Sequence, residues 1–142
     1  MSAIILFMSN SAKKKAKIYY DKWRKEKTYS PALKKNIKIT KKGWRHITGA
    51  PGHKKRPFKD VYRRLKLLPY AKFIIKKSST IQSVRNKNGI KYFALEAVIP
   101  VKMNQIKSLR VVKVVIQEDK KGNLIFLSIM DKKKLNASCL GQ

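Results

Sequence analysis

The sequence predicts an α+β fold, with N-terminal helices packed on one face of a four- or five-stranded antiparallel sheet. Apolar residues recur with a helical period near 3.6 before Pro69 and with a period of 2 after it. Two polar, glycine-containing segments, 86–89 and 119–123, interrupt the alternating part as hairpin turns do. Helices that precede strands in this way usually cover one face of the sheet and leave the other face open.

Two helices are expected in the first half of the chain. The first covers 10–27, where Ser11 can cap the start and apolar residues up to Trp23 follow a helical period. The second covers 57–68, because Pro57 suits a first helical turn and Pro69 ends the pattern. Between them, 34–48 has an uneven pattern that predicts a short helix or an extended arm, and 49–52 is a Gly/Pro loop.

The second half is expected to form a meander of short strands. Strands are predicted over 70–77, 80–85, 91–99, 109–118 and 124–130, with a longer connection between 100 and 108. The length of 142 residues predicts one domain, made of a helical part (about 10–68), the meander (70–131) and a flexible tail (132–142).

Alternation along these strands separates two faces of the sheet. The predicted core face carries apolar residues such as Leu95 and Val114. The opposite face is expected to collect Lys72, Lys76, Tyr92, Glu96, Lys113, Gln117, Phe126 and Ser128. Cations among aromatic rings suit a nucleic acid, since bases stack and phosphates pair. An ordinary solvated face with cross-strand ion pairs would have the same composition.

Charge is the strongest compositional feature. The chain has 36 lysines and arginines against seven acidic residues, a formal net charge of +29. Such a chain repels itself when compact, and a polyanionic partner is the usual reason for it. DNA, RNA, an anionic membrane surface and an acidic protein all fit, whereas a small acidic substrate does not require this charge. A lysine-rich codon bias in an AT-rich genome is a further contribution.

Several classes of site are not expected. Cys139 is the only cysteine, so neither an intrachain disulfide nor a thiolate zinc site is predicted. The seven acidic residues are scattered and there are two histidines, so no metal or other cofactor is expected. The apolar run 3–8 is too short for a membrane span and is a poor signal peptide. A cytoplasmic site of action is expected, for a resident protein or for a toxin delivered there.

Cleavage of RNA without a metal needs few groups, because the 2′-hydroxyl is itself the nucleophile. His46 lies between an arginine and a Gly/Pro loop, in Gly-Trp-Arg-His-Ile-Thr-Gly at 43–49, where it could act as a base. It could equally be a structural histidine. Glu96 is a candidate base or an ion-pair partner of Lys113, and Ser128 is a candidate phosphate contact or a small residue on the wet face. The candidate catalytic residues are therefore His46, Glu96, Lys113 and Ser128. The candidate RNA-binding residues are Arg45, His53, Lys54, Arg56, Arg63, Lys72, Lys76, Tyr92, Gln117 and Phe126.

This organisation resembles the barnase–EndoU–colicin–RelE group of metal-independent ribonucleases. The similar stretches are 44–49 (Trp-Arg-His-Ile-Thr-Gly) and the final hairpin, 111–116 through 123–128, within a likeness covering roughly 40–131. The resemblance implies an endoribonuclease, a toxin, effector or phage-type domain, with RNA such as tRNA or rRNA on a concave sheet face. It also implies an acidic immunity or antitoxin partner and a monomeric state. A second well-placed histidine is missing, so the acid–base pair stays open.

Two other functions fit the same sequence. A non-catalytic RNA-binding protein, such as a ribosome-associated one, would explain the charge without using His46. A DNA-binding or phage structural protein would use the basic helix 12–27 and Arg63–Arg64 in place of the sheet.

The net charge predicts RNA binding that weakens steeply with salt. Because each neutralised phosphate releases condensed counterions, log affinity should fall with log salt by about 0.7 per phosphate contact on a single strand. Titration of a fluorescent oligoribonucleotide at several salt concentrations measures this slope. A flat dependence up to physiological ionic strength would contradict the electrostatic interpretation.

Overall fold

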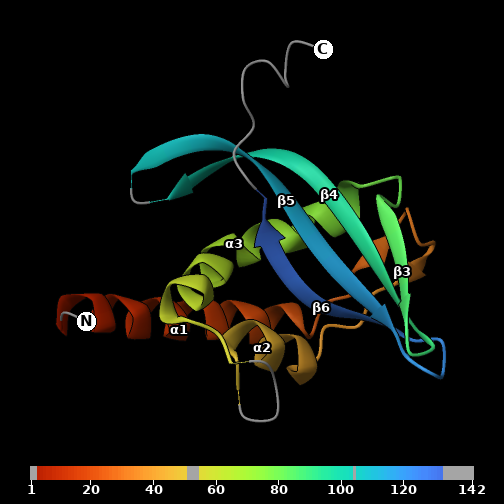
Figure 1. Cartoon of the computed structure of the whole chain (residues 1–142), viewed down its shortest axis with the longest axis horizontal. Helices are drawn as coiled ribbons and strands as arrows, with labels where there is room; N and C mark the ends of the chain where they lie inside the picture. Colours follow the sequence, from red (N-terminus) through yellow and green to blue (C-terminus); the bar gives the residue numbers. More distant parts are fainter. Residues whose placement is uncertain (1–2, 51–54, 104, 133–142) are drawn as a thin grey trace.

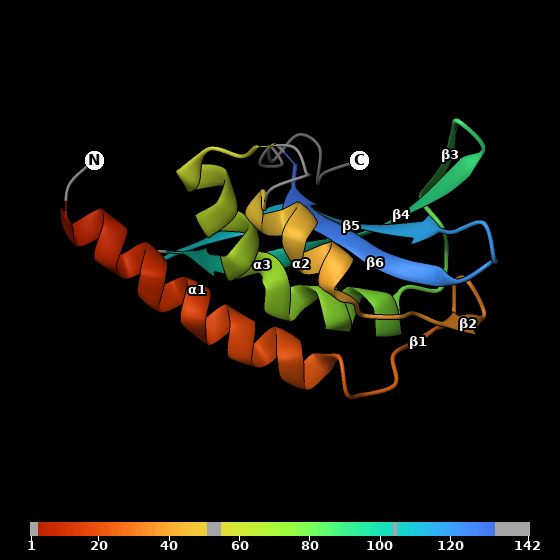
Figure 2. The same cartoon turned by 90° about the horizontal axis from the view of Figure 1, so that it is seen from below.

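The computed structural model describes residues 3–50, 55–103 and 105–132, and within them it confirms the α+β fold. Helices α1 (Ala3–Trp23), α2 (Lys41–Thr48) and α3 (Phe58–Lys77) come before a four-stranded antiparallel sheet. Figures 1 and 2 show the three helices gathered on one side of this sheet. The predicted tail beyond residue 132 lies outside the described residues.

The sheet is a simple meander with the strand order β3-β4-β5-β6. Its strands are β3 (Ser83–Lys87), β4 (Ile90–Met103), β5 (Ile106–Glu118) and β6 (Leu124–Asp131). At the first hairpin, Asn88 and Gly89 have φ of 54° and 80°, the left-handed conformation that the Asn-Gly pair favours. The expected long connection between 100 and 108 is wrong, because β4 and β5 stay paired until Met103 faces Ile106.

The segment between α1 and α2 is an extended arm that joins the edge of the large sheet. Strands β1 (Tyr29–Ser30) and β2 (Lys35–Asn36) pair with each other. Lys38 then bridges in parallel to Ile125, with its backbone bonded to Leu124 and Phe126. The uneven pattern over 34–48 thus corresponds to an arm followed by a short helix, the two forms that the sequence left open.

The core lies between the helices and the covered face of the sheet. Tyr20 and Trp23 of α1 meet Phe126 of β6, with ring centroids 6.3 and 5.2 Å from that of Phe126. Leu95 and Val114 are fully buried on the face predicted for them. The indole nitrogen of Trp23 donates to Thr28 Oγ1 at 2.8 Å, so the largest core side chain leaves no polar group unpaired.

The strand predicted over 70–77 is wrong, because this segment continues α3 through Pro69. A proline inside a helix loses one backbone hydrogen bond and costs about 3 kcal/mol. Here Leu68, Ala71 and Ile75 are fully buried at helical spacing, and their burial outweighs this cost. Lys72 and Lys76 therefore lie on a helix and not on the open face of the sheet. Lys72 pairs with the carboxylate of Glu26.

The face assignment within 124–130 is also wrong. The register of β6 against β5 shifts between Val115 and Ile116, a β-bulge that places Phe126 opposite Ile116 and Ser128 opposite Val115. One extra residue in a strand breaks strict alternation. Phe126 is consequently a core residue with no exposed surface, and Ser128 is 1% exposed, so neither belongs to an open wet face.

We expect Gly43→Ala to destabilise the fold. A Cβ at this position would lie 2.6 Å from both the carbonyl oxygen of Phe126 and the hydroxyl of Tyr20. Overpacking of this kind costs about 1–3 kcal/mol. Urea denaturation followed by circular dichroism measures the change, with Arg45→Ala as the control on an exposed position of the same helix. Equal midpoints for wild type and Gly43→Ala would contradict the close contact.

Candidate active site

Helix α2 presents His46 because both of its ends are fixed and one face is buried. The Thr40 hydroxyl accepts from the backbone of Lys42 at 3.2 Å and caps the start. Gly49 ends the helix with φ of 68°. Gly43 and Ile47 form the buried face, so His46, one residue before Ile47, is half-buried at the side of the helix.

His46 contacts Arg56, which comes from the segment before α3. The Arg56 side chain donates to the carbonyl oxygen of His46 at 2.8 Å, and its Nη2 lies 2.9 Å from His46 Nε2. Because a guanidinium is only a donor, Nε2 must be the accepting nitrogen of the imidazole. This contact requires a neutral ring with its proton on Nδ1. Both residues are partly buried.

A second arginine continues this network to the sheet. Asp60 Oδ2 accepts from Arg56 Nη1 and from Arg64 Nε, each at 3.1 Å. Arg64 Nη1 then donates to the Ser128 hydroxyl at 2.5 Å and to the carbonyl oxygen of Ile129 at 3.2 Å. Two of the predicted catalytic residues, His46 and Ser128, are thus connected through Arg56, Asp60 and Arg64.

Two further arginines lie at the end of β6. Asp131 Oδ2 is 3.2 Å from Arg110 Nη1, and Asp131 Oδ1 is 3.7 Å from Arg63 Nε. The Asp131 side chain is only 4% exposed, whereas those of Arg63 and Arg110 are 49% and 25% exposed. The two guanidiniums are therefore anchored by a buried carboxylate and remain accessible to an anion. We call Arg56, Arg63, Arg64, Arg110, Asp60 and Asp131 the arginine cluster.

The electrostatics of the arginine cluster favour a bound anion. Burial lowers the pKa of the Arg64 guanidinium, the neighbouring charge of Arg56 lowers it further, and Asp60 opposes both effects. Arginine stays protonated in proteins, so this shift means that its charge is held at an electrostatic cost. Four guanidiniums against two carboxylates leave a net charge of +2. A phosphate at this position would reduce the repulsion.

The other two predicted catalytic residues lie across the sheet. Glu96 and Lys113 face each other in register on β4 and β5. In the register of β5 and β6, Asp131 pairs with Val112, which is buried on the face covered by the helices. Lys113 follows Val112 in β5, so its side chain points to the other face of the sheet. Glu96 Oε1 is 2.7 Å from Lys132 Nζ, so its ion pair is with Lys132 and not with Lys113. The four predicted residues thus form two separate groups, His46 with Ser128 and Glu96 with Lys113.

The predicted RNA-binding residues also lie in different parts of the structure. Arg56 and Arg63 belong to the arginine cluster, and Arg45 is exposed on α2. Gln117 is only 5% exposed; its Nε2 donates to the Tyr92 hydroxyl at 3.3 Å, and Lys42 Nζ donates to Gln117 Oε1 at 2.5 Å. This pair of bonds fixes the Gln117 amide and leaves the Tyr92 proton available to an acceptor. His53 and Lys54 lie outside the described residues.

Four functional candidates were missed at the sequence level, namely Lys42, Asp60, Arg110 and Asp131, and Arg64 was considered only for a DNA-binding function. A partial signal was present in the four-residue spacing of Arg56, Asp60 and Arg64, which places the last two on one helix face. Nothing in the local sequence indicates that Lys42 reaches Gln117 or that Arg110 reaches Asp131.

Two searches of the described residues and three comparisons complete the description of the site. Within 3–50, 55–103 and 105–132, no group of three or more His, Cys, Asp or Glu side chains is placed to hold a metal ion. In the same residues, no helix has the length and apolar character needed to cross a membrane. Comparison with protein-family models, with curated proteins and with solved structures found no match.

We expect Arg64→Ala to lower the free energy of unfolding by about 2–4 kcal/mol, because it leaves Asp60, Ser128 and Ile129 without their shared donor. Arg63→Ala removes an equal charge from the same helix, but from a longer and more exposed ion pair, and should cost about 1 kcal/mol or less. Chemical denaturation of both variants gives the comparison. Equal losses of unfolding free energy in the two variants would show that the buried hydrogen bonds of Arg64 contribute no more to stability than the exposed ion pair of Arg63.

Proposed function

We propose that this protein is a metal-independent endoribonuclease with His46 and the arginine cluster as its active site. The observation that supports the proposal most directly is the 2.9 Å contact between His46 Nε2 and Arg56 Nη2, at the edge of a cluster with excess positive charge. A neutral imidazole beside guanidiniums combines a proton acceptor with phosphate-binding groups. These are the groups that cleavage at an RNA phosphodiester requires.

In the proposed reaction, the 2′-oxygen of RNA forms a bond to phosphorus and the bond from phosphorus to the 5′-oxygen breaks. His46 Nε2 takes the 2′-hydroxyl proton, which requires Arg56 to turn from the imidazole toward the entering phosphate. Arg63 and Arg110, the accessible guanidiniums, stabilise the charge that grows on the phosphoryl oxygens. The 5′-oxygen takes a proton from a second group. The products are a 2′,3′-cyclic phosphate and a 5′-hydroxyl.

Glu96, Lys113 and Ser128 remain the candidates for the second proton-transfer group. Ser128 is held by Arg64 and is nearly buried, which favours a positioning role for it. Glu96 and Lys113 lie on the open face beside Lys132, at the same end of β6 as Asp131. An RNA strand that passes over this end of the sheet would meet both groups.

The charge of +29 supports folded RNAs such as tRNA or rRNA as substrates, in the cytoplasm where they occur. The same charge supports an acidic protein of the immunity or antitoxin kind as an inhibitor, since an acidic surface would compete with RNA for the arginine cluster. Electrostatic complementarity with this site is what supports both proposed partners.

A second candidate function is RNA binding without cleavage. It is favoured by the hydrogen-bonded chain of Lys42, Gln117 and Tyr92, which orients a tyrosine on the open face of the sheet. Aromatic side chains on a sheet surface bind unpaired bases by stacking, with no chemical step. RNA that shifts in a gel but is not cut would support this function and contradict the first.

The test of cleavage uses purified protein, total RNA and EDTA. We expect wild type to leave 2′,3′-cyclic phosphate ends and to spare an oligonucleotide with a single deoxyribose at its cleavage site. His46→Ala should reduce turnover by about 10²-fold or more, because it removes a general base, while RNA affinity stays near that of wild type. Full activity in His46→Ala, equal cutting of DNA, or an absolute need for Mg²⁺ would each contradict the proposal.

Two open-face variants separate proton transfer from binding in the same assay. Glu96→Gln keeps size and removes the ionisable carboxylate, so a proton-transfer role predicts lost turnover with unchanged thermal stability. A structural ion pair with Lys132 predicts the reverse. Lys113→Ala should weaken RNA binding and reduce the salt slope if Lys113 contacts phosphate. Lys59→Ala, exposed on α3, is the matched control for the loss of one positive charge.

A further inference from the structure

We infer that a single strand of RNA binds in a groove between α1 and α2, with a phosphate in one pocket and an unpaired base in the next. The choice of RNA as the ligand rests on the proposed function. The groove itself lies apart from the arginine cluster and uses other residues. Two pockets make up the groove, and Lys17 lines both of them.

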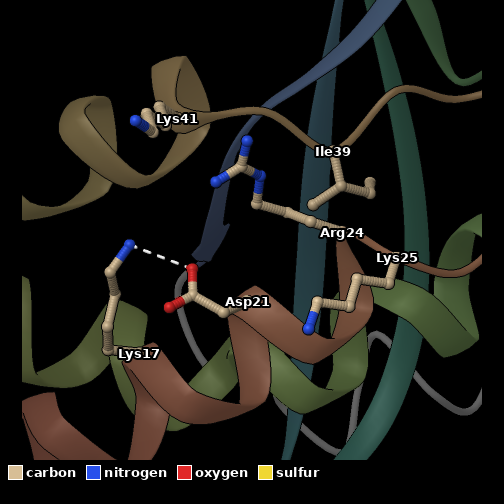
Figure 3. Close-up of a pocket in the computed structure, with 6 residues that line it drawn as sticks. All are labelled: Lys17, Asp21, Arg24, Lys25, Ile39 and Lys41. Atoms are coloured by element: carbon tan, nitrogen blue, oxygen red, sulfur yellow. Dashed lines mark hydrogen bonds and ion pairs between the residues drawn. The ribbon is translucent and has the colours of Figure 1, made fainter.

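The first pocket, shown in Figure 3, is a cavity of about 580 Å³ between the C-terminal half of α1, the arm before α2 and the start of α2. Its lining residues are Lys17, Asp21, Arg24, Lys25, Ile39 and Lys41. Lys17 Nζ lies 3.1 Å from Asp21 Oδ1, which compensates one cation. Among the described residues, no carboxylate pairs with Arg24, Lys25 or Lys41. Figure 3 shows the guanidinium of Arg24 between Asp21 and Lys41. The pocket therefore holds uncompensated positive charge.

The start of α2 adds to this potential. The helix opens with Lys41 and Lys42 and has no acidic residue in its first turn. A helix N-terminus carries a partial positive charge, so lysines in the first turn are unfavourable unless an anion is present. A phosphate between Arg24 and Lys41 would compensate both side chains and the helix dipole. The size of the pocket is sufficient for a phosphodiester and its ribose.

The second pocket combines apolar and basic side chains. It is a cavity of about 630 Å³ lined by Lys13, Lys14, Lys17, Ile18 and Trp44. Ile18 is 72% exposed, so its side chain is accessible to a ligand in this pocket. Lys17 Nζ lies 5.1 Å from the centre of the Trp44 ring, and Tyr20 supports this ring at a centroid distance of 5.6 Å. An indole with an exposed aliphatic neighbour provides an apolar surface for a nucleobase.

The shared Lys17 makes the two pockets one site. Proteins that bind single-stranded nucleic acid combine a basic surface for the backbone with apolar or aromatic surfaces for the bases. In this groove the first pocket provides the basic surface and the second pocket provides the apolar one. A duplex keeps its bases inside the stack, so it can fill the first pocket but cannot bring a base to Trp44. The expected ligand is consequently single-stranded.

Helix α2 connects this groove to the proposed active site. Lys41 lines the first pocket, and His46 follows five residues later, about 7.5 Å along the helix axis. A strand held at Lys41 would therefore reach His46 within a few nucleotides. In this arrangement the groove positions a segment of the substrate that is not cut.

The first test follows the two tryptophans by ¹⁹F NMR after labelling with 5-fluorotryptophan, in the His46→Ala background so that RNA stays intact. Trp23 is 1% exposed and serves as the internal control, and Trp44→Phe assigns the signals. Oligouridylate should shift the Trp44 signal and leave that of Trp23 unchanged. Inorganic polyphosphate and a blunt RNA duplex, which supply phosphates without accessible bases, should leave Trp44 unchanged. No shift with oligouridylate, or equal shifts with all three, would overturn the inference.

The second test changes the charge of the first pocket in both directions. Asp21→Asn removes the pocket's own carboxylate and should tighten oligouridylate binding by about threefold, whereas Glu118→Gln, the same charge change at a residue of β5 that lines neither pocket, should alter it less. Arg24→Ala with Lys41→Ala should weaken binding by about tenfold and lower the salt slope by about 0.7 for the lost phosphate. If Asp21→Asn and Glu118→Gln changed the affinity for oligouridylate equally, long-range attraction alone would explain the binding. That result would overturn the proposed phosphate pocket.

The two proposals fail in different ways. RNA that shifts Trp44 but is never cut by wild-type protein would support the groove and contradict the nuclease. RNA that is cut normally without any response at Trp44 or Asp21 would support the nuclease and contradict the groove. An acidic peptide that displaces bound RNA without changing the ¹⁹F signal of Trp44 would also count against the base-binding pocket.

Discussion

The close contact between α2 and β6 is the constraint on which the rest of the structure depends. Gly43 lies against the Phe126 backbone with no room for a Cβ, and the parallel bridge from Lys38 to Ile125 fixes the chain just before the helix. The Tyr20 hydroxyl, which donates to the carbonyl oxygen of Thr40, ties the same point to α1. As a result, one short helix is held by two other elements. Its C-terminal end carries His46 and its N-terminal end borders the groove.

Much of the fold could be predicted from the sequence where a single periodicity applied. Leu95 of β4 and Val114 of β5 are buried on the face that the alternation predicts, and Asn88-Gly89 marks the hairpin between β3 and β4, so at these positions the local pattern and the final structure agree. The segment 70–77 fits either period, and its helix is decided by burial against α1 and the sheet, which no local pattern contains. The bulge in β6 likewise depends on the partner strand. A strict alternation therefore misplaced Phe126, and it could not indicate that Ser128 is buried beside Arg64.

The candidate site was less predictable because its contacts join distant parts of the chain. His46, Arg56 and Arg63 were identified by residue type and by the neighbouring loop, which are local signals. The position of Arg63 depends on Asp131 of β6, and that of Arg56 depends on His46 and Asp60; these contacts exist only in the folded chain. The bond from Arg64 to Ser128 spans 64 residues and that from Lys42 to Gln117 spans 75. Spacing in the sequence cannot indicate such pairs, so the separation of Glu96 and Lys113 from His46 and Ser128 could not be foreseen.

The few acidic residues of this chain are placed where they order cations and do not simply neutralise them. Asp60 and Asp131 each hold two arginines, and Asp21 and Glu26 each hold one lysine on α1 or α3. A chain that used its carboxylates only to reduce repulsion would spread them evenly among its lysines. Here two of them fix guanidiniums, the side chains with the geometry for a bidentate phosphate contact. The remaining positive charge stays uncompensated in the folded protein, so the energy of self-repulsion is relieved when a polyanion binds. In the proposed function, the same imbalance that costs stability in the free protein would drive binding, and the arginine cluster would determine where along the polyanion a phosphate is held.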